Sequence, residues 1–142
     1  MVLKVKRLRS SAKVPTKAHK TDAGFDLYAS EYVDMEPSGI TLVPTGIAVE
    51  IPEGYCGIIK DRSSMVTLYG HQVVAGVIDS HYRGEVKIAL KVIKEFPVFS
   101  IEPGLKIAQL VIVPIPDLEI KEVDDLTDTD RGEKGFGSSG SK

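Results

Sequence analysis

Short β-rich segments follow one another along most of the chain, and this pattern constrains the fold more than any other feature of the sequence. The segments are 2–8 (VLKVKRL), 40–52 (ITLVPTGIAVEIP), 55–60 (YCGIIK), 85–93 (EVKIALKVI) and 105–115 (LKIAQLVIVPI). Glycine, proline or charged residues bound them, as is typical of strands. Helical periodicity is limited to one or two turns near 63–70. The sequence therefore predicts an all-β barrel or sandwich.

Length and charge narrow the possible functions. The 142 residues fit one domain with a hydrophobic core. A net charge of -2 gives no global basic field to recruit nucleic acid, although a local cluster of Arg and Lys can still hold phosphate. No segment approaches the roughly 20 apolar residues of a membrane span, and the N-terminus lacks the apolar run of a signal peptide. We therefore expect neither a membrane nor a nucleic-acid partner.

Cysteine and histidine usage favours a reducing compartment and no zinc site. Cys56 is the single cysteine, so it cannot form an internal disulfide, and it reads as a small buried hydrophobe. His19, His71 and His81 lie far apart and have no cysteine companions, so zinc-type spacing is absent. We expect a cytoplasmic protein.

The C-terminal tail, residues 124–142 (DDLTDTDRGEKGFGSSGSK), is polar and glycine-rich, which alone indicates a disordered end. GFGSSG at 135–140 matches G-x-G-x-x-G, but the strand, helix and distant acid of a dinucleotide site are missing. Ser141 precedes Lys142, so the order of a Walker A motif is also wrong. Glycine N–H groups and serine hydroxyls still suit an anion, and Arg131 can add a forked charge. Phe136 either stacks on a flat ligand or pins the tail to the body.

Two polar segments in the body each allow a structural and a functional interpretation. In 61–65 (DRSSM), Arg62, Ser63 and Ser64 either form a phosphate site at a helix start or supply a serine N-cap. In 22–29 (DAGFDLYA), Asp22 suits an Asx-type turn. A carboxylate of this segment can alternatively lie near Mg²⁺ on a polyphosphate, an ion that usually keeps most of its waters.

Two further features are similarly open. Gln109 interrupts a core strand, so it needs a hydrogen-bond partner, which is either a neighbouring backbone group or a ligand oxygen. In 76–85 (GVIDSHYRGE), Asp79 follows a short apolar run and precedes a strand, which predicts a hairpin turn. An aspartate there commonly caps its own backbone, but Tyr82, three residues later, can face the same pocket.

Taken together and in order, the segments DAGFDLYA, DRSSM, GVIDSHYRGE, GLKIAQLVIVP and RGEKGFGSSG resemble the all-β, homotrimeric dUTPase family (deoxyuridine triphosphate nucleotidohydrolase) from about Asp22 to Gly140. The resemblance implies a jelly-roll-like β-barrel over 1–126. It also implies a flexible glycine-rich arm over 127–142 that closes over an active site of a neighbouring subunit. The expected reaction is Mg²⁺-dependent hydrolysis of dUTP to dUMP and pyrophosphate, which keeps uracil out of DNA and supplies dUMP for thymidylate synthesis.

The resemblance also implies a set of site residues. Asp79 would orient and deprotonate the attacking water and bind the sugar 3′-OH, and Tyr82 would pack on the deoxyribose and exclude a 2′-OH. Asp26 would reach Mg²⁺ through water. The base would be read by the backbone around Gly76, Val77, Ile78 and Lys87. Phosphates would be held by Arg62, Ser63, Ser64 and Gln109. The arm would stack Phe136 on the base and clamp the phosphates with Arg131, Gly137 and Ser138.

Two alternatives to a dUTPase follow from the same residues. Ser64 stands where the family usually has glycine, and Arg-Ser-Ser also resembles the related dCTP deaminases or bifunctional deaminase–diphosphatases. Against this, the strand after the third segment has no acid beyond Glu85, Tyr82 stands where deaminases favour Trp, and their tails lack the glycine-rich arm. The other alternative is a nucleotide-binding regulator on the same scaffold, which signals through closure of the arm.

Overall fold

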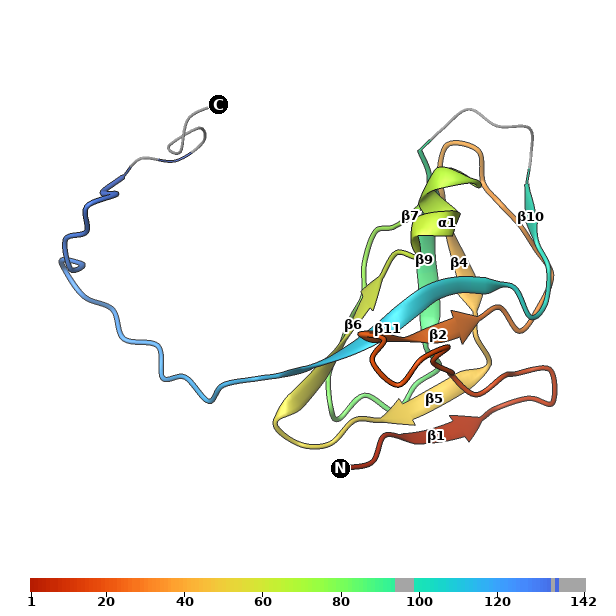
Figure 1. Cartoon of the computed structure of the whole chain (residues 1–142), viewed down its shortest axis with the longest axis horizontal. Helices are drawn as coiled ribbons and strands as arrows, with labels where there is room; N and C mark the ends of the chain where they lie inside the picture. The colour runs from red at the N-terminus through yellow and green to blue at the C-terminus, as the bar shows by residue number, and fades with distance from the viewer. Residues whose placement is uncertain (94–98, 134, 136–142) are drawn as a thin grey trace.

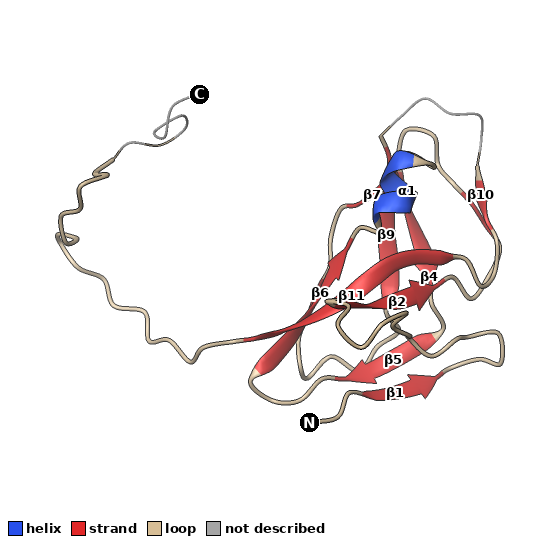
Figure 2. Cartoon of the chain, in the orientation of Figure 1, coloured by secondary structure: helices blue, strands red, loops and turns tan. Residues whose placement is uncertain are grey.

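The regular secondary structure of the described residues is almost entirely β-strand, as the sequence predicts (Figure 2). The computed structural model describes residues 1–93, 99–133 and 135. The elements are β1 (Lys4–Arg7), β2 (Gly24–Tyr28), β3 (Val33–Asp34), β4 (Ile40–Pro44), β5 (Ile47–Glu50), β6 (Tyr55–Lys60), α1 (Ser63–Thr67), β7 (His71–Val73), β8 (Val77–Ile78), β9 (Lys87–Val92), β10 (Ser100–Ile101) and β11 (Lys106–Pro114). The short helix falls where the sequence allows one.

The described strands form antiparallel sheets that wrap around one core (Figure 1). The largest has the order β2-β11-β6-β8, and a second has the order β4-β9-β7. The pairs β1-β5 and β10-β3 complete the set. Neighbours in these sheets are mostly distant in sequence, which is the mark of a jelly-roll-like fold rather than of a meander of hairpins.

Alternation of apolar and polar residues explains which face of the second sheet is buried. In β4, Thr41 and Val43 point into the core, and in β9, Ile88 and Leu90 do the same. Their neighbours on the other face are exposed or half-buried, because successive side chains of a strand point to opposite sides. The core side chains with almost no exposed surface include Leu27, Val43, Ile47, Met65, Ile88, Leu90, Ile101, Ile107 and Leu110.

A β-bulge in β11 sets the register of the polar residues on the largest sheet. The pairing of β11 with β2 shifts between Lys106 and Ala108, so that Ile107 and Ala108 are both fully buried although they are adjacent. Beyond the bulge, Gln109 pairs with Asp26 of β2 on one side and with Lys60 of β6 on the other. The bulge therefore decides which polar side chains of β2 and β11 meet.

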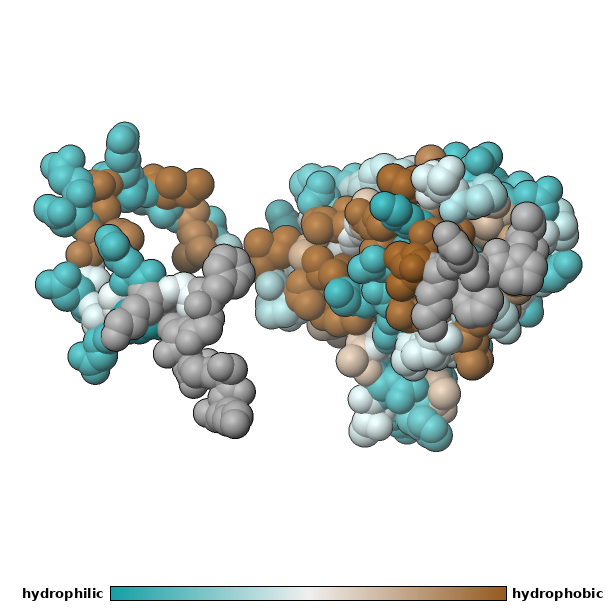
Figure 3. All heavy atoms as spheres, turned by 90° about the horizontal axis from the view of Figure 1, so that it is seen from above, coloured by the Kyte–Doolittle hydropathy of each residue, from teal (hydrophilic) through white to brown (hydrophobic). Residues whose placement is uncertain are grey.

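After β11 the chain leaves the barrel and runs outward in an extended path (Figure 1). Its apolar side chains are left in solvent: Leu118 is 75% exposed, Ile120 97% and Leu126 86%. Figure 3 shows these hydrophobic groups alternating with hydrophilic ones along the extended segment. These large apolar groups are therefore not packed against the described part of their own chain.

Candidate active site

The Asp79 hairpin lines a pocket of about 440 Å³, which we call the hairpin pocket. It is lined by Val77, Ile78, Asp79, Tyr82, Glu85 and Lys87. Most of these residues were predicted from the sequence to bind substrate, and the fold brings them together around one short turn. Glu85 was not among the predicted site residues.

The hairpin starts where β8 pairs with β6. Ile78 lies opposite Gly57 and Val77 opposite Ile58, and the Ile59 N–H donates to the Gly76 carbonyl at 2.7 Å. Gly76 approaches β6 so closely that a Cβ atom there would lie 2.5 Å from the Cβ of Ile59. Only glycine fits at this approach.

Asp79 begins the turn that the sequence predicts. The Tyr82 N–H donates to the Asp79 carbonyl at 3.1 Å, which closes the turn. The Asp79 side chain is exposed, and within the described residues its carboxylate has no hydrogen-bond or ion-pair partner. It does not cap its own backbone, so the carboxylate is available to a ligand or a water molecule.

Tyr82 folds back across the hairpin. Its hydroxyl donates to the Glu85 carbonyl at 3.0 Å, while the side chain stays 43% exposed at the pocket. Gly84 makes this possible, because a Cβ atom there would collide with the Tyr82 hydroxyl. The ring is therefore held in place at one end and presents its surface to the pocket.

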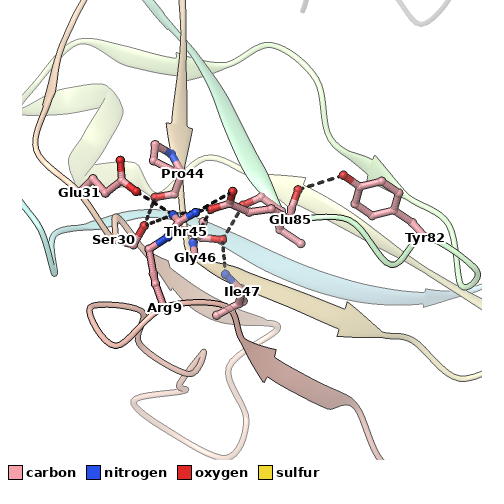
Figure 4. Close-up of polar contacts among 10 residues, drawn as sticks. Arg9, Ser30, Glu31, Pro44, Thr45, Gly46, Ile47, Tyr82 and Glu85 are labelled. Carbon is pink, nitrogen blue, oxygen red and sulfur yellow. Dashed lines mark hydrogen bonds and ion pairs between the residues drawn. The ribbon is translucent and has the colours of Figure 1, made fainter.

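The Glu85 carboxylate ties the hairpin to the body of the protein (Figure 4). It accepts two hydrogen bonds from the Arg9 guanidinium, at 2.8 and 3.1 Å, and one from the Gly46 N–H at 2.8 Å. Burial of Glu85 opposes its ionisation, but the hydrogen bonds from Arg9 and Gly46 outweigh this, so its pKa lies below the ordinary value. Glu85 is thus a charged structural residue with both oxygens in use.

A second pocket, of about 320 Å³, lies at the start of α1. Its lining includes the cations of Arg62 and Lys106 as well as the carboxylates of Asp22 and Asp26; we call it the cationic pocket. It is lined by Ala18, Asp22, Ala23, Gly24, Asp26, Arg62, Ser63, Ser64, Lys106 and Gln109. The fold thus brings the predicted phosphate-binding residues at the start of α1 and in β11 together with Asp26 of β2, the residue predicted to reach Mg²⁺.

Asp26 organises the cations of this pocket. The Arg62 Nε lies 2.9 Å from Asp26 Oδ1, and the Lys106 Nζ lies 2.7 Å from Asp26 Oδ2. The hydrogen bond to Asp26 raises the pKa of Lys106. Lys106 was not predicted as a site residue, because only the register of β11 against β2 places it beside Asp26.

The two serines of the cationic pocket do not cap the helix. Arg62 occupies the N-cap position of α1, without a side-chain capping bond, so the interpretation of Ser63 or Ser64 as an N-cap is wrong. Ser64 Oγ accepts a long hydrogen bond of 3.4 Å from Arg62, and Ser63 is exposed. Both hydroxyls therefore line the pocket instead of closing the helix.

Gln109 is satisfied by the backbone on one side. Its Nε2 donates to the Asp61 carbonyl at 2.8 Å. Of the two partners considered for Gln109, a backbone group and a ligand oxygen, the amide nitrogen thus has the backbone group. The Asp61 carboxylate in turn accepts a hydrogen bond from the Val73 N–H at 2.6 Å. Gln109 therefore braces the loop that carries Arg62 while it also lines the cationic pocket.

The acidic residues suit a water-mediated metal contact only. Within the described residues, no group of three or more His, Cys, Asp or Glu side chains could hold a metal ion. Each oxygen of Asp26 already accepts from one cation, but a carboxylate oxygen has a second lone pair that can accept a water proton. Asp26 is thus compatible with a Mg²⁺ ion that keeps its own waters, and the predicted contact stays a prediction.

The hairpin and cationic pockets share no lining residue. Arg131 lies in the extended segment after β11 and lines neither pocket. Phe136, Gly137 and Ser138, which the sequence assigns to substrate binding, lie outside the described residues. No helix in the described part of the chain has the length and apolar character needed to cross a membrane.

The fold is an all-β barrel with two pockets. One contains an unpaired carboxylate, and the other contains cations and hydroxyls, groups that suit a small anionic ligand. Comparison with known proteins makes this specific. The model of the dUTPase family matches residues 10–140. The chain belongs to the dUTPase family.

Individual relatives agree with this assignment. The chain is 42% identical to the deoxyuridine 5′-triphosphate nucleotidohydrolase of Clostridium kluyveri, over 99% of each chain. It is also 42% identical to the enzyme of the same name from Mycolicibacterium vanbaalenii, over 97% of this chain and 94% of that one. A mutant of the Staphylococcus bacteriophage 80alpha dUTPase, solved with dUpNHpp, has a TM-score of 0.86 at 36% identity and covers 98% of both chains.

Proposed function

We propose that this chain is a dUTP diphosphatase, which hydrolyses dUTP to dUMP and pyrophosphate. The observation that carries the proposal is the Asp79 carboxylate, which stands unpaired in the hairpin pocket of a chain of this family. The reaction keeps uracil out of DNA and supplies dUMP for thymidylate synthesis.

Asp79 acts on the water in this proposal. Position is the main demand on a group with this role. Asp79 orients a water molecule toward the α-phosphorus and accepts its proton as the new P–O bond forms. The bond from the α-phosphorus to its bridging oxygen breaks, and pyrophosphate leaves with the electron pair of that bond. Asp79 also binds the sugar 3′-OH.

The hairpin reads the nucleoside. β8 is the last strand of its described sheet, so the edge of Gly76, Val77 and Ile78 away from β6 presents free backbone donors and acceptors. These groups can match the edge of uracil and mismatch cytosine, whose donor pattern is the opposite, and Lys87 adds its backbone to the same pocket. Tyr82 packs on the deoxyribose and excludes a 2′-OH.

The cationic pocket receives the phosphates. Arg62, Ser63, Ser64 and Gln109 line it together, and the replacement of the usual family glycine by Ser64 leaves a backbone N–H in place. Arg131, Phe136, Gly137 and Ser138 belong to the arm, 127–142, which in this proposal closes over the bound nucleotide and excludes water.

Mg²⁺ binding forms part of the proposal. A solved dUTPase of phage phi11 of S. aureus is described as coordinating a structural Mg(II) ion; it is 33% identical to this chain, with a TM-score of 0.81 and coverage of 88% of this chain and 98% of that one. Here Asp26 is the residue that would hold Mg²⁺, through water. The bound ion would neutralise charge on the phosphate oxygens.

A homotrimer explains why the functions are divided between two pockets. One nucleotide needs a base-reading hairpin and a phosphate site together, yet these pockets share no residue within one chain. We propose that the hairpin pocket of one subunit meets the cationic pocket of another, and that a third subunit supplies the arm. The apolar residues exposed along the segment after β11 support a path of this segment across a neighbour. A cytoplasmic location completes the proposal.

The deaminase alternative is not favoured by the geometry. β9, which follows the hairpin, contains no acidic residue. Glu85 precedes it, but its oxygens accept hydrogen bonds from Arg9 and Gly46, so it is not available for proton transfer. A regulatory role on the same scaffold would leave Asp79 without a use.

The deciding experiment measures pyrophosphate release with Mg²⁺ from dUTP, dCTP, dTTP and UTP in parallel, with ammonia followed in the dCTP reaction. We expect turnover of dUTP only. Asp79→Asn should reduce kcat by a factor of about 10² to 10⁴, the usual contribution of a general base, while nucleotide binding is largely kept. Glu53→Gln, at an exposed carboxylate in the turn between β5 and β6 and outside both pockets, is the matched control. Ammonia from dCTP, or equal rates for wild type and Asp79→Asn, would contradict the proposal.

A further inference from the structure

The end of the Asp79 hairpin is fixed by a part-buried ion pair that reaches back to the N-terminal segment. Arg9 and Glu85 are 76 residues apart, and they meet through two parallel hydrogen bonds. The Glu85 side chain is only 15% exposed and the Arg9 side chain 33%. A forked, partly shielded pair of this kind holds a defined geometry, whereas an exposed lysine pair does not.

Arg9 is itself held in position. Its Nη1 donates to Ser30 Oγ at 3.0 Å and lies 2.9 Å from the Glu31 carboxylate. Ser30 Oγ donates in turn to the Pro44 carbonyl at 3.1 Å. Figure 4 shows these groups converging with Glu85 at the end of β4. The guanidinium is therefore a fixed point of the barrel rather than a mobile side chain.

The peptide unit between Glu85 and Val86 connects the Arg9–Glu85 ion pair to Tyr82. A peptide unit is planar, so its N–H and C=O point in opposite directions. The Val86 N–H donates to the Ile47 carbonyl at 2.9 Å, and on the other side the Glu85 carbonyl accepts from the Tyr82 hydroxyl at 3.0 Å. The ion pair of the Glu85 side chain holds the Glu85 end of this peptide unit, and the hydrogen bond from the Val86 N–H to Ile47 sets its orientation. Through Glu85, the position of the Tyr82 ring thus depends on Arg9 and Ile47, which lie outside the pocket.

We propose that Arg9 and Glu85 are positioning residues for sugar selection: they hold Tyr82 at the depth in the hairpin pocket where its ring admits deoxyribose and excludes a 2′-OH. This inference rests on the proposed function, because it assigns a cause to the discrimination between dUTP and UTP. Arg9 touches neither pocket, and Glu85 acts through its carbonyl and its ion pair, not on the nucleotide.

The test compares four variants of the full-length protein: Arg9→Gln, Arg9→Lys, Glu85→Gln and the control Lys4→Gln. Lys4 forms an ion pair of 2.6 Å with Glu50 in the same N-terminal region. That pair is exposed, and its link to the hairpin is the charge of Arg83 near Glu50, not a contact with Tyr82 or Glu85. For each variant, kcat and KM are measured with dUTP and with UTP, or the inhibition constant of UTP where its turnover is too slow. A 3-fluorotyrosine ¹⁹F spectrum of the ligand-free protein, assigned through Tyr82→Phe, reports the environment of Tyr82 without any catalysis.

We expect Arg9→Gln and Glu85→Gln to lower the preference for dUTP over UTP by about tenfold or more, since loss of a positioned contact in a specificity site is worth at least this factor. The Tyr82 resonance should shift or broaden in both. Arg9→Lys keeps the charge but lacks the fork, so it should fall between wild type and Arg9→Gln. Lys4→Gln should match wild type in the preference and in the spectrum.

Other outcomes would overturn the inference. A lower Tm with an unchanged dUTP-to-UTP preference and an unchanged Tyr82 resonance would show that the ion pair is only a structural anchor. If Glu85→Gln does not fold, Arg9→Lys decides the question, because it alters the fork at a residue outside both pockets. A wild-type protein inactive on dUTP would refute the proposed function. The ¹⁹F spectra would then still show whether Arg9 and Glu85 position Tyr82.

Discussion

At the residue scale, His71 is a titratable side chain enclosed in the apolar core. It is 1% exposed, its Nδ1 has no hydrogen-bond partner among the described residues, and its ring lies 5.3 Å from the ring of Phe99. Burial lowers its pKa below the ordinary value, because the charged imidazolium is disfavoured away from water. The sequence had offered His71 only as an isolated histidine, and the structure shows it as a buried packing residue.

The buried imidazole predicts that the protein becomes less stable in mild acid. The pKa of His71 is lower in the folded state than the value of 6.5 expected after unfolding. The stability that this difference contributes is therefore complete above pH 6.5 and is lost as the pH falls toward the folded pKa. Because the unfolded chain binds one more proton, the slope is about 1.4 kcal/mol per pH unit at most.

Urea unfolding at fixed protein concentration between pH 7.5 and 5.5 measures this slope. His71→Phe should flatten it, while His19→Gln, at an exposed histidine, should leave it unchanged. An equal slope for His71→Phe and wild type would show that other groups cause the acid sensitivity.

At the element scale, the close contact between β8 and β6 sets where the hairpin begins. Gly76 lies against Ile59, and the pairing of Ile78 with Gly57 continues the contact into the strand. β8 has only two residues, so it has few other bonds to hold its register. A small displacement at Gly76 would move Asp79 and Tyr82 together.

Gly76→Ala should therefore damage activity as well as stability. The added methyl group would lie 2.5 Å from the Cβ of Ile59, so β8 must move outward. Overpacking of this kind costs about 1–3 kcal/mol, and a shift of about 1 Å in a catalytic group can cost about 10²-fold in rate. Gly39→Ala is the control, because its methyl group would lie 3.3 Å from the Cβ of Glu36 in a loop outside both pockets.

Steady-state kinetics with dUTP and urea unfolding of the same samples separate the two effects. If Gly76→Ala were as active as Gly39→Ala, the close contact would not position the hairpin.

At the scale of the whole molecule, each chain carries two pockets that share no lining residue. It also carries an extended segment with exposed apolar groups that no part of the described chain covers (Figure 3). Both features are understandable if several copies assemble, because symmetric association places each hairpin pocket against a neighbour's cationic pocket.

Mixing two inactive variants tests this division directly. Asp79→Asn disables the hairpin pocket and Arg62→Ala the cationic pocket. In mixed trimers some sites combine an intact Asp79 from one subunit with an intact Arg62 from another. Random assembly of equal amounts should restore about a quarter of the wild-type sites if each site needs both subunits.

Activity is measured after the two variants are unfolded together and refolded, and it is compared with each variant refolded alone. If the refolded mixture stayed as inactive as the separate variants, each site would lie within one subunit and the shared-site proposal would be wrong.

The sequence by itself determined the local structure and the identity of the family. Strand after strand lies where β-branched runs and glycine or proline boundaries predict it, because these signals act between near neighbours. The turn at Asp79 and the short helix after Arg62 are equally local. The family was identifiable because five segments occur in a fixed order, and this order can be read from the sequence without the fold.

Only the tertiary structure decided which of these parts meet. The bulge in β11 brings Lys106 to Asp26, and the fold brings Arg9 to Glu85 across 76 residues; neither pair has a signal in the sequence. The two serines after Arg62 suited a helix cap equally well until the N-cap position excluded it. The physical reason is that sheet register and side-chain burial are set by long-range packing, and local patterns do not encode it.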